Sequence, residues 1–444
     1  MENILSVFKS KEVLKKIGFT LLAFFVYKAA TLITLPLINP LSIQAFFTAN
    51  SGGVLGIANA FTGNALKNYS IIALGISPYI TASIVVQLLQ MDIIPVLKEW
   101  AEEGETGKQK INQLTRYLAI GLGFAQALAM TLGFANQSGD GILVAGVDGT
   151  VMVYIYLAFV MTGGTAFLLW LSDQITLRGI GNGTSMIIVA GIVSSMPSMF
   201  VSLYERYILG MQIDGTTIDP GTTEYITFAL VVLLYIVVIF FVTIMQAAAR
   251  KVPIQYANRP ASAKFQGKSD SNIPIKINSA GVIPVIFAVT ILSIPTTILN
   301  FSGMDQGSTL SIWLTEVFTY QRPLGYVIYV ALIFVFAFFY AFVQINPDKV
   351  AKNLQKQNAY VPGVRPGVDT ENYLSRLLFK LTMVGATYLV FIASLPIFAS
   401  MIFGLPSYVQ VGGTSLLIVV GVAIETTKQI KTQTQEQKYS GFIK

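Results

Sequence analysis

GISPYITA (Gly75–Ala82) and GVIPVIFA (Gly281–Ala288) share the pattern G-x-x-P-x-I-x-A, and each lies in a long apolar stretch. A second pair of stretches, GTSMII (Gly183–Ile188) and GTSLLI (Gly413–Ile418), shares the pattern G-T-S-x-x-I. Internal repeats of this kind indicate that a chain is built from copies of a smaller unit. The places of the four copies among the apolar stretches therefore decide how the two units are related.

The composition is that of a protein surrounded by lipid. Hydrophobic residues make up 54% of the 444 residues and charged residues 11%, whereas a soluble domain carries about 25% charged residues. A membrane-spanning helix needs about 20 mostly apolar residues. The sequence predicts ten such spans, near residues 17–38, 71–90, 114–134, 151–171, 184–204, 225–246, 280–299, 324–343, 377–398 and 414–427.

The basic residues predict the orientation of these spans. If the N-terminus is cytoplasmic, only Lys67, Arg206 and Arg322 of the 29 Lys and Arg residues fall in outer loops. Lys28 falls inside the first span, and all the others fall in cytoplasmic segments. Cytoplasmic loops of membrane proteins are enriched in Lys and Arg. We therefore expect the protein to lie in the cytoplasmic membrane with both termini in the cytoplasm.

The repeat predicts two inverted halves. The partners in each pair lie five spans apart, so they cross the membrane in opposite directions. We expect an all-α integral membrane protein with ten transmembrane helices in two inverted five-helix halves around a central pore. The N-terminal half covers residues 1–204, an external hinge loop covers 205–224, and the C-terminal half covers 225–444. Simple helix-packing similarity is the alternative explanation of the repeat.

The pathway between the halves is predicted to be apolar. The repeat singles out Ile80, Ile188, Ile286 and Ile418, and Ile84 lies one turn beyond Ile80 on the same helix face. A narrow apolar constriction can close a pore by excluding water. An ion-coupled transporter would place carboxylates at mid-membrane, and no Asp or Glu lies deep within a predicted span.

The chain lacks the residues of most hydrolytic and metal chemistry. It contains no Cys and no His, which excludes disulfides and thiolate metal sites and removes the commonest general base and metal ligand. The absence of buried Asp pairs also argues against an intramembrane protease. No Walker-type phosphate-binding sequence is present. We therefore expect no enzyme activity, no cofactor and no metal.

Three connecting segments invite a functional interpretation. The outer loop from Asn39 to Ser70 is rich in Gly and small apolar residues, and is either an ordinary loop or a re-entrant stopper beside the pore. Two long basic cytoplasmic segments, 247–277 and 344–376, either attract anionic lipid or form a docking platform for a large partner. The charges alone leave these alternatives open.

Several long stretches together resemble the SecY/Sec61-alpha family of protein-conducting channels over nearly the whole chain. They are ALGISPYITASIVVQLL, EEGETGKQKINQLTRY, RGIGNGTSMIIVAGIV, KINSAGVIPVIFA, INPDKVAKNLQKQNAYVPGVRPG and GGTSLLIVVGVAIE. The resemblance implies a clamshell of two halves around an hourglass pore. It also implies a lateral gate between the second and third spans and the seventh and eighth.

The resemblance also assigns site residues. The pore ring falls on Ile80, Ile84, Thr184, Ile188, Ile286 and Ile418. Thr184 departs from the family, which usually has an aliphatic residue there. The plug helix falls on about residues 56–69, including Thr62, Gly63, Asn64, Ala65 and Leu66. Cytoplasmic docking falls on Arg259, Lys264 and Arg365, although Ala263 and Asn272 depart from the family pattern.

The function implied by the resemblance is that of the central subunit of the SecYEG channel. Such a subunit is a passive gated pore that passes unfolded preproteins across the membrane and inserts membrane proteins into it. The SecA ATPase or the ribosome supplies the energy. Further implied partners are SecE, SecG, signal peptides, nascent chains, membrane lipid, YidC, SecDF and a second copy of the chain. An accessory SecY paralogue that exports a restricted set of substrates is the alternative.

Overall fold

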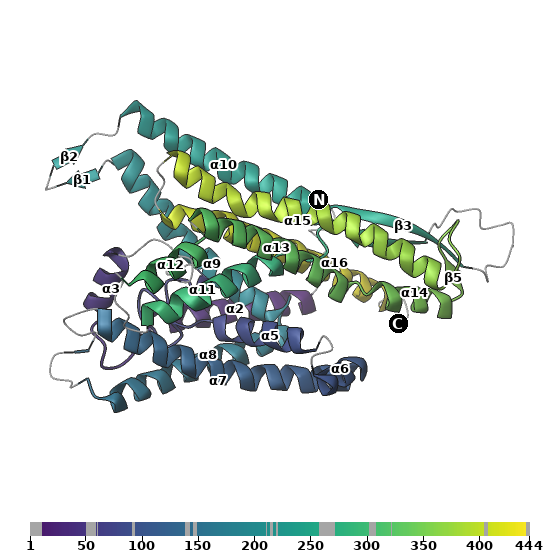
Figure 1. The fold of residues 1–444 in the computed structure, drawn as a ribbon, viewed down its shortest axis with the longest axis horizontal. Coiled ribbons are helices and arrows are strands. Elements are labelled where there is room, and N and C mark those ends of the chain that lie inside the picture. Colours follow the sequence, from purple (N-terminus) through teal and green to yellow (C-terminus); the bar gives the residue numbers. More distant parts are fainter. Residues whose placement is uncertain are drawn as a thin grey trace.

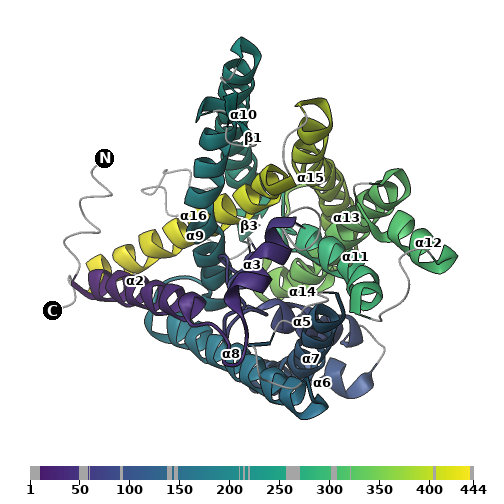
Figure 2. The ribbon, with the colours of Figure 1, turned by 90° about the vertical axis from the view of Figure 1, so that its left-hand side faces the viewer.

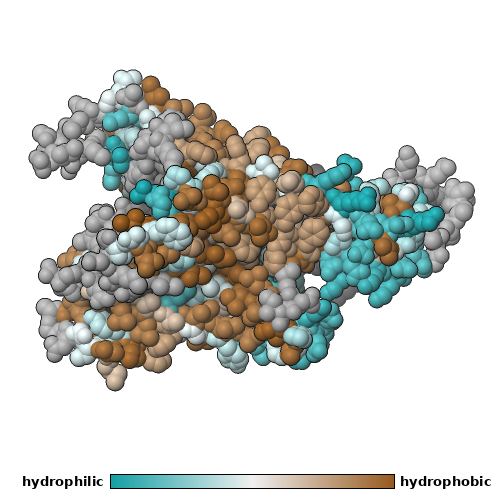
Figure 3. Space-filling view, in the orientation of Figure 1, coloured by the Kyte–Doolittle hydropathy of each residue, from teal (hydrophilic) through white to brown (hydrophobic). Residues whose placement is uncertain are grey.

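The computed structural model describes most of the chain as helices that run roughly along one direction (Figure 1). The described residues are 11–49, 59, 61–90, 94–137, 143–144, 149–209, 211–213, 216–218, 221–256, 271–301, 308–320, 322–403 and 407–440. An apolar surface covers the middle of the molecule, and a polar surface covers the end that carries α14 (Pro347–Lys356) and β5 (Ala359–Tyr360) (Figure 3). This division fits a protein that crosses a membrane.

Each of the ten predicted spans overlaps one described helix. These helices are α2 (Lys11–Leu32), α5 (Ser77–Leu89), α7 (Glu105–Gln137), α8 (Val151–Arg178), α9 (Gly183–Tyr204), α10 (Thr222–Ala247), α11 (Ile283–Phe301), α13 (Pro323–Gln344), α15 (Val368–Phe403) and α16 (Ser407–Ser440). Within the described ranges, six helices are long and apolar enough to cross a membrane, whereas α5 and α11 are shorter apolar helices. The fold is that of a multi-pass membrane protein, and the count of ten spans stays a prediction.

Short elements that the sequence did not predict connect the long helices. Four of them are the helices α3 (Pro40–Ala49), α6 (Pro95–Glu102), α12 (Thr309–Phe318) and α14. A π-helical turn, Glu205–Leu209, and a hairpin of β1 (Met211–Ile213) and β2 (Thr216–Ile218) lie in the predicted hinge loop. The strands β1 and β2 are three residues long each and lie outside the predicted spans.

A small antiparallel sheet joins the two long basic segments. Its strand order is β4 (Ser271–Lys276), β3 (Ala249–Tyr256) and β5, with Gln255 opposite Tyr360. Side chains of the sheet, including Val252 and Ile275, share a buried core with α14 and the start of α15. The two segments therefore form one folded unit, although about 100 residues of sequence separate their strands.

The first repeated sequence builds the same local structure twice. Gly75 and Gly281 both have a positive φ, 58° and 67°, which glycine adopts at little cost. In each copy the helix begins two residues after the glycine, and the proline falls in its first turn, where its missing N–H is tolerated. The predicted span 71–90 therefore starts in turns and becomes a helix only at Ser77.

The second repeated sequence does not begin its helices in the same way. Helix α9 begins at Gly183, because Gly181 has a φ of 84° and the Asn182 side chain caps the Thr184 N–H. Helix α16 already begins at Ser407, so Gly413 lies inside it. The tenth span is predicted near residues 414–427, and apolar residues from Tyr408 can extend it; the helix begins one residue before Tyr408.

Each half has its own core, and further clusters of apolar side chains join the halves. In Figure 2 the helices α2, α5, α7 and α8 occupy the lower part of the view, and α10 to α13 and α15 lie above them or to the right. One core packs α10, α11, α13, α15 and α16. Another packs α3, α7, α8 and the turns before α5. A hydrogen bond also joins the two halves: the backbone N–H of Gly181 donates to Gln429 Oε1 of α16 at 2.7 Å.

A glycine contact supports the turn before each copy of the first repeat. A Cβ atom built at Gly164 of α8 would lie 1.9 Å from the carbonyl oxygen of Ile71. A Cβ atom built at Gly385 of α15 would lie 2.8 Å from the carbonyl oxygen of Ile277. Ile71 and Ile277 both precede the motif glycine by four residues, and α8 and α15 correspond to the fourth and ninth predicted spans. The repeat therefore extends from sequence to packing.

Candidate pore and plug

Four isoleucines singled out by the repeat gather in one apolar cluster. Ile418 of α16 is buried in it, and Ile80 of α5, Ile188 of α9 and Ile286 of α11 are partly buried against it. These helices come from both predicted halves. Aliphatic side chains can enclose a passing chain without preferring particular side-chain chemistry, because the hydrophobic effect is non-directional. The geometry is that expected of an apolar constriction.

Ile84 lies in a neighbouring cluster. It is buried with Phe287 of α11 and Phe336 of α13, and the two aromatic rings meet edge to face with their centroids 5.6 Å apart. Ile80 is partly buried against the same cluster. This second cluster joins α5 to α11 and α13, where the family resemblance implies a lateral gate. Its contacts are apolar side chains, which can separate without leaving charges unpaired.

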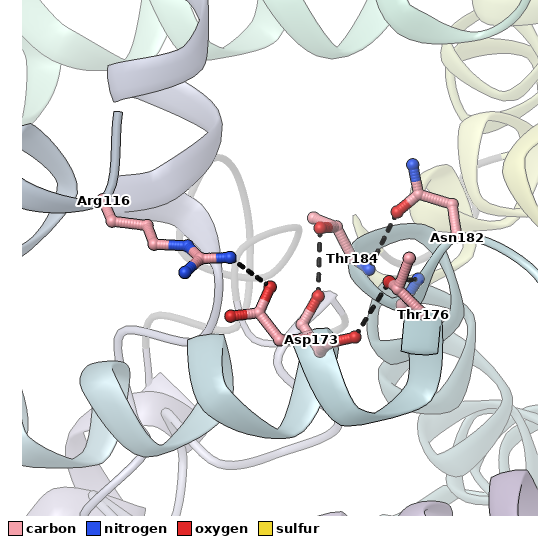
Figure 4. Close-up of polar contacts among 7 residues, drawn as sticks. Arg116, Asp173, Thr176, Asn182 and Thr184 are labelled. Atoms are coloured by element: carbon pink, nitrogen blue, oxygen red, sulfur yellow. Dashed lines mark hydrogen bonds and ion pairs between the residues drawn. The ribbon is translucent and has the colours of Figure 1, made fainter. Parts of the chain in front are cut away.

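Thr184 has a polar partner within its own half. The side-chain oxygens of Thr184 and Ser172 lie 3.1 Å apart and form a hydrogen bond between α9 and α8 (Figure 4). The Thr176 hydroxyl accepts a hydrogen bond from the Gly183 N–H at 2.9 Å. The hydroxyl that interrupts the predicted aliphatic ring is therefore engaged by a neighbouring helix.

An ion pair lies beside this hydroxyl group. Arg116 of α7 donates to Asp173 of α8 at 2.7 Å (Figure 4). Both side chains are more than a third exposed, and such pairs contribute little to stability. The pair joins α7 to α8 at the residue that follows Ser172, the partner of Thr184.

The predicted plug segment packs beside the four isoleucines. Thr62, Gly63, Ala65 and Leu66 are buried and Asn64 is partly buried. Ala65 belongs to the cluster that contains Ile418, and Leu66 belongs to the core of the N-terminal half. Residues 62–69 form a series of turns, so the expected helix is wrong for this part. Positive φ angles at Gly63, Asn64 and Tyr69 break the helix. Residues 56–58 and 60 lie outside the described residues.

The predicted docking residues are described only in part. Arg365 is exposed in the turn between β5 and α15, and its carbonyl accepts a hydrogen bond from the Thr370 hydroxyl at 2.8 Å. This turn rests on the buried core beneath the sheet. Arg259 and Lys264 lie outside the described residues. Arg365 is therefore an exposed cation on a turn that packs against a buried core.

The side chains of the described residues lack the pattern of a metal site. They contain no group of three or more His, Cys, Asp or Glu side chains that could hold a metal ion. An apolar cluster of side chains from four helices, with a packed segment beside it, fits a membrane channel better than a carrier with a polar binding site.

Comparisons with known proteins identify the family. The sequence model of SecY matches residues 70–427. The protein translocase subunit SecY of Bacillus subtilis strain 168 is 45% identical over 443 residues, covering 100% of this chain and 99% of that protein. The subunit of the same name from Staphylococcus aureus strain NCTC 8325 is 42% identical over 445 residues, with the same coverage. The chain belongs to the SecY family.

Solved structures show the same fold. A structure of a protein-conducting channel has a TM-score of 0.60 at 16% identity, covering 95% of this chain and 92% of that one. A structure that concerns the SecY plug domain has a TM-score of 0.63 at 17% identity, with the same coverage. The chain is thus a non-catalytic channel subunit that crosses the cell membrane several times. The match to SecY subunits supports the main interpretation over the accessory paralogue.

Sequence reasoning missed residues that hold the site together. The G-T-S pattern continues to G-T-S-x-x-I-V-x-G, so Gly191 of α9 corresponds to Gly421 of α16. Gly164 and Gly385 each begin a G-x-x-aromatic-Leu sequence, Gly164–Leu168 and Gly385–Leu389. A search for further similarities five spans apart would have found both pairs. Tyr27 of α2, whose hydroxyl donates a hydrogen bond to the Thr62 carbonyl in the predicted plug segment, carries no sequence signal.

Proposed function

We propose that the chain is the central pore of a SecYEG-type translocon, which passes unfolded preproteins outward and releases apolar segments sideways into lipid. The observation that supports this most strongly is the cluster in which isoleucines of four helices meet the predicted plug segment. A translocating chain would displace residues 56–69 and pass between Ile80, Ile84, Thr184, Ile188, Ile286 and Ile418. Both termini would lie in the cytoplasm.

Energy would come from a partner that binds the cytoplasmic sheet. We assign this docking to SecA and the ribosome, with Arg365 and the basic residues Arg259 and Lys264 as contacts. Related channel structures include Sec61 in a ribosome–channel complex, at a TM-score of 0.57. SecE and SecG would complete the channel, and YidC, SecDF and a second copy are further expected partners. Signal peptides, nascent chains and lipid would contact the gate.

Single-cysteine variants test the pore directly, because the natural chain has no Cys. A preprotein carrying one cysteine and a folded C-terminal block is stalled in the channel with SecA and ATP. Ile286→Cys should form a disulfide with the stalled chain. The matched control, Phe240→Cys, lies on α10 with 68% of its side chain exposed and should not. Equal crosslinking of both variants, or none at Ile286→Cys, would reject the proposed path.

Charge reversal tests the docking surface. Arg365→Glu should strongly reduce SecA-dependent export while the protein still inserts and assembles. Lys428→Glu makes the same charge change at an exposed position of α16 and should leave export near its normal level. Normal export by the Arg365→Glu variant would refute the assignment of docking to this turn.

A further inference from the structure

The plug segment contacts α2 through a buried tyrosine. Tyr27 of α2 is 2% exposed, and its hydroxyl donates to the backbone carbonyl of Thr62 at 2.8 Å. A buried carbonyl needs a partner, since an unpaired one is costly to remove from water. The bond therefore ties the backbone of the plug segment to a helix that forms part of the N-terminal half.

A pair of glycines brings the same segment against α9. A Cβ atom at Gly191 would lie 2.2 Å from the carbonyl oxygen of Phe61 and 3.0 Å from the Tyr27 hydroxyl oxygen. Gly63 has a φ of 65°, and a Cβ atom there would lie 3.1 Å from the Gly191 Cα. The close approach of the segment to α9 requires the absence of side chains at both positions.

The segment has internal bonds of its own. The Thr62 hydroxyl accepts from the Leu66 N–H at 3.3 Å, and Asn59 Oδ1 accepts from the Lys67 N–H at 2.8 Å. The side chains of Asn59 and Asn64 are joined at 3.0 Å. These bonds stay intact if the segment moves as a body, whereas the contacts of Tyr27 and Gly191 do not.

Phe61 links the segment to the other half. Its side chain packs against the cluster that contains the pore isoleucines and also against the core of the C-terminal half. A change in the distance between the halves therefore acts on the residue directly before the Tyr27 contact.

We propose that Tyr27 and Gly191 form a seat that holds the plug on the N-terminal half, and that opening the channel breaks the Tyr27–Thr62 bond and separates the two glycines. This inference rests on the proposed plug function. Tyr27 and Gly191 are positioning residues, since they act through the plug and not on the translocating chain. Phe61 transmits the separation of the halves to this seat.

Thiol labelling of the closed channel tests the seat. Ala65→Cys places a thiol in the plug segment at a position that is 0% exposed. In the complete membrane complex, adding Tyr27→Phe should raise the rate of maleimide labelling about tenfold, because the carbonyl loses its partner and the segment leaves its seat more often. An unchanged labelling rate would overturn the proposal.

Two controls separate the seat from general loosening. Tyr326→Phe removes a tyrosine hydrogen bond of similar length, 2.7 Å to Ser394 within the C-terminal half, and should leave the Ala65→Cys labelling rate unchanged. Ala158→Cys is equally buried in α8, and its labelling should not change with Tyr27→Phe. A parallel rise at Ala158→Cys would overturn the seat in favour of a general loss of packing.

Iodide flux into proteoliposomes separates this inference from the plug function itself. Deletion of residues 61–66 should raise the flux, and Tyr27→Phe should raise it to a smaller extent. If only the deletion raises the flux, the plug stands and the seat is refuted. If the deletion leaves the flux unchanged, the plug function fails. If Tyr27→Phe prevents assembly, Gly191→Ala provides the same measurement, because its Cβ displaces Phe61.

Discussion

The two halves use one helix surface in different ways. Gly191 of α9 and Gly421 of α16 are equivalent in the repeat, but backbone of the predicted plug segment covers Gly191. A Cβ atom built at Gly191 would lie 2.2 Å from the carbonyl oxygen of Phe61. Among the described residues, a Cβ atom at Gly421 meets only side-chain atoms, the nearest being 3.4 Å away on Val282. The N-terminal half therefore holds an extra segment on a surface that the C-terminal half covers with ordinary side-chain contacts. The two halves therefore share the repeated helices, and they differ in that only the glycine of the N-terminal half packs against backbone of an added segment.

The largest expected effect tests what the halves share. Gly164→Ala places a Cβ 1.9 Å from the Ile71 carbonyl oxygen, and backbone cannot move aside cheaply. We expect it to lower the free energy of unfolding by about 3 kcal/mol, measured by denaturant unfolding in micelles. Gly385→Ala, at 2.8 Å from the Ile277 carbonyl, should cost about 1 kcal/mol. A Cβ atom built at the neighbouring Gly163 meets no atom of the described residues within 4 Å, so Gly163→Ala should not lower the free energy of unfolding. An equal loss from both neighbours would contradict the packing.

The next effect tests where the halves differ. Gly191→Ala should lower the free energy of unfolding by about 2 kcal/mol, because its Cβ overlaps the plug backbone. Gly421→Ala makes only an ordinary contact and should change it by less than about 0.5 kcal/mol. The comparison is made in the same unfolding assay. Similar losses at the two positions would mean that the plug does not distinguish the halves.

Alanine at the motif glycines separates backbone strain from crowding. Gly75→Ala and Gly281→Ala both force a positive φ on alanine, which should lower the free energy of unfolding by about 1–2 kcal/mol. A Cβ atom at Gly75 also lies 2.9 Å from the Thr62 Cγ2 atom, whereas one at Gly281 meets no atom of the described residues within 4 Å. Thr62→Ser removes that methyl group and keeps the hydroxyl. It should recover part of the Gly75→Ala loss and none of the Gly281→Ala loss, as measured by a double-mutant cycle.

The smallest effect concerns the hydroxyl in the predicted ring. Thr184→Val is close in shape and removes the bond to Ser172, so we expect a loss of about 1 kcal/mol in the free energy of unfolding. Ser172→Ala should cost a similar amount. The double variant should cost less than the sum of the two, since both remove one bond. Simple additivity would show that the hydroxyls do not interact.

Much of the fold and of the waist could be predicted from sequence. Apolar stretches and loop charges depend on local composition, and the spacing of the repeat alone brought Ile80, Ile188, Ile286 and Ile418 together. Helix α16 begins before the predicted span 414–427, because Gly412 and Gly413, which disfavour a helix interior, nevertheless lie inside it. The strands β3 and β5 were missed because their pairing joins segments far apart in sequence.

The sequence by itself determined the membrane class and predicted two related halves and the isoleucines that meet in one apolar cluster, because hydrophobicity, charge and repetition are properties of the residues in order. Tertiary structure alone decided which partner each group meets. It placed Ser172 against the Thr184 hydroxyl, and it gave Gly191 a backbone neighbour and Gly421 a side-chain neighbour. The Tyr27 bond to the Thr62 carbonyl belongs to the same category, because a backbone acceptor has no side-chain identity that a sequence could reveal.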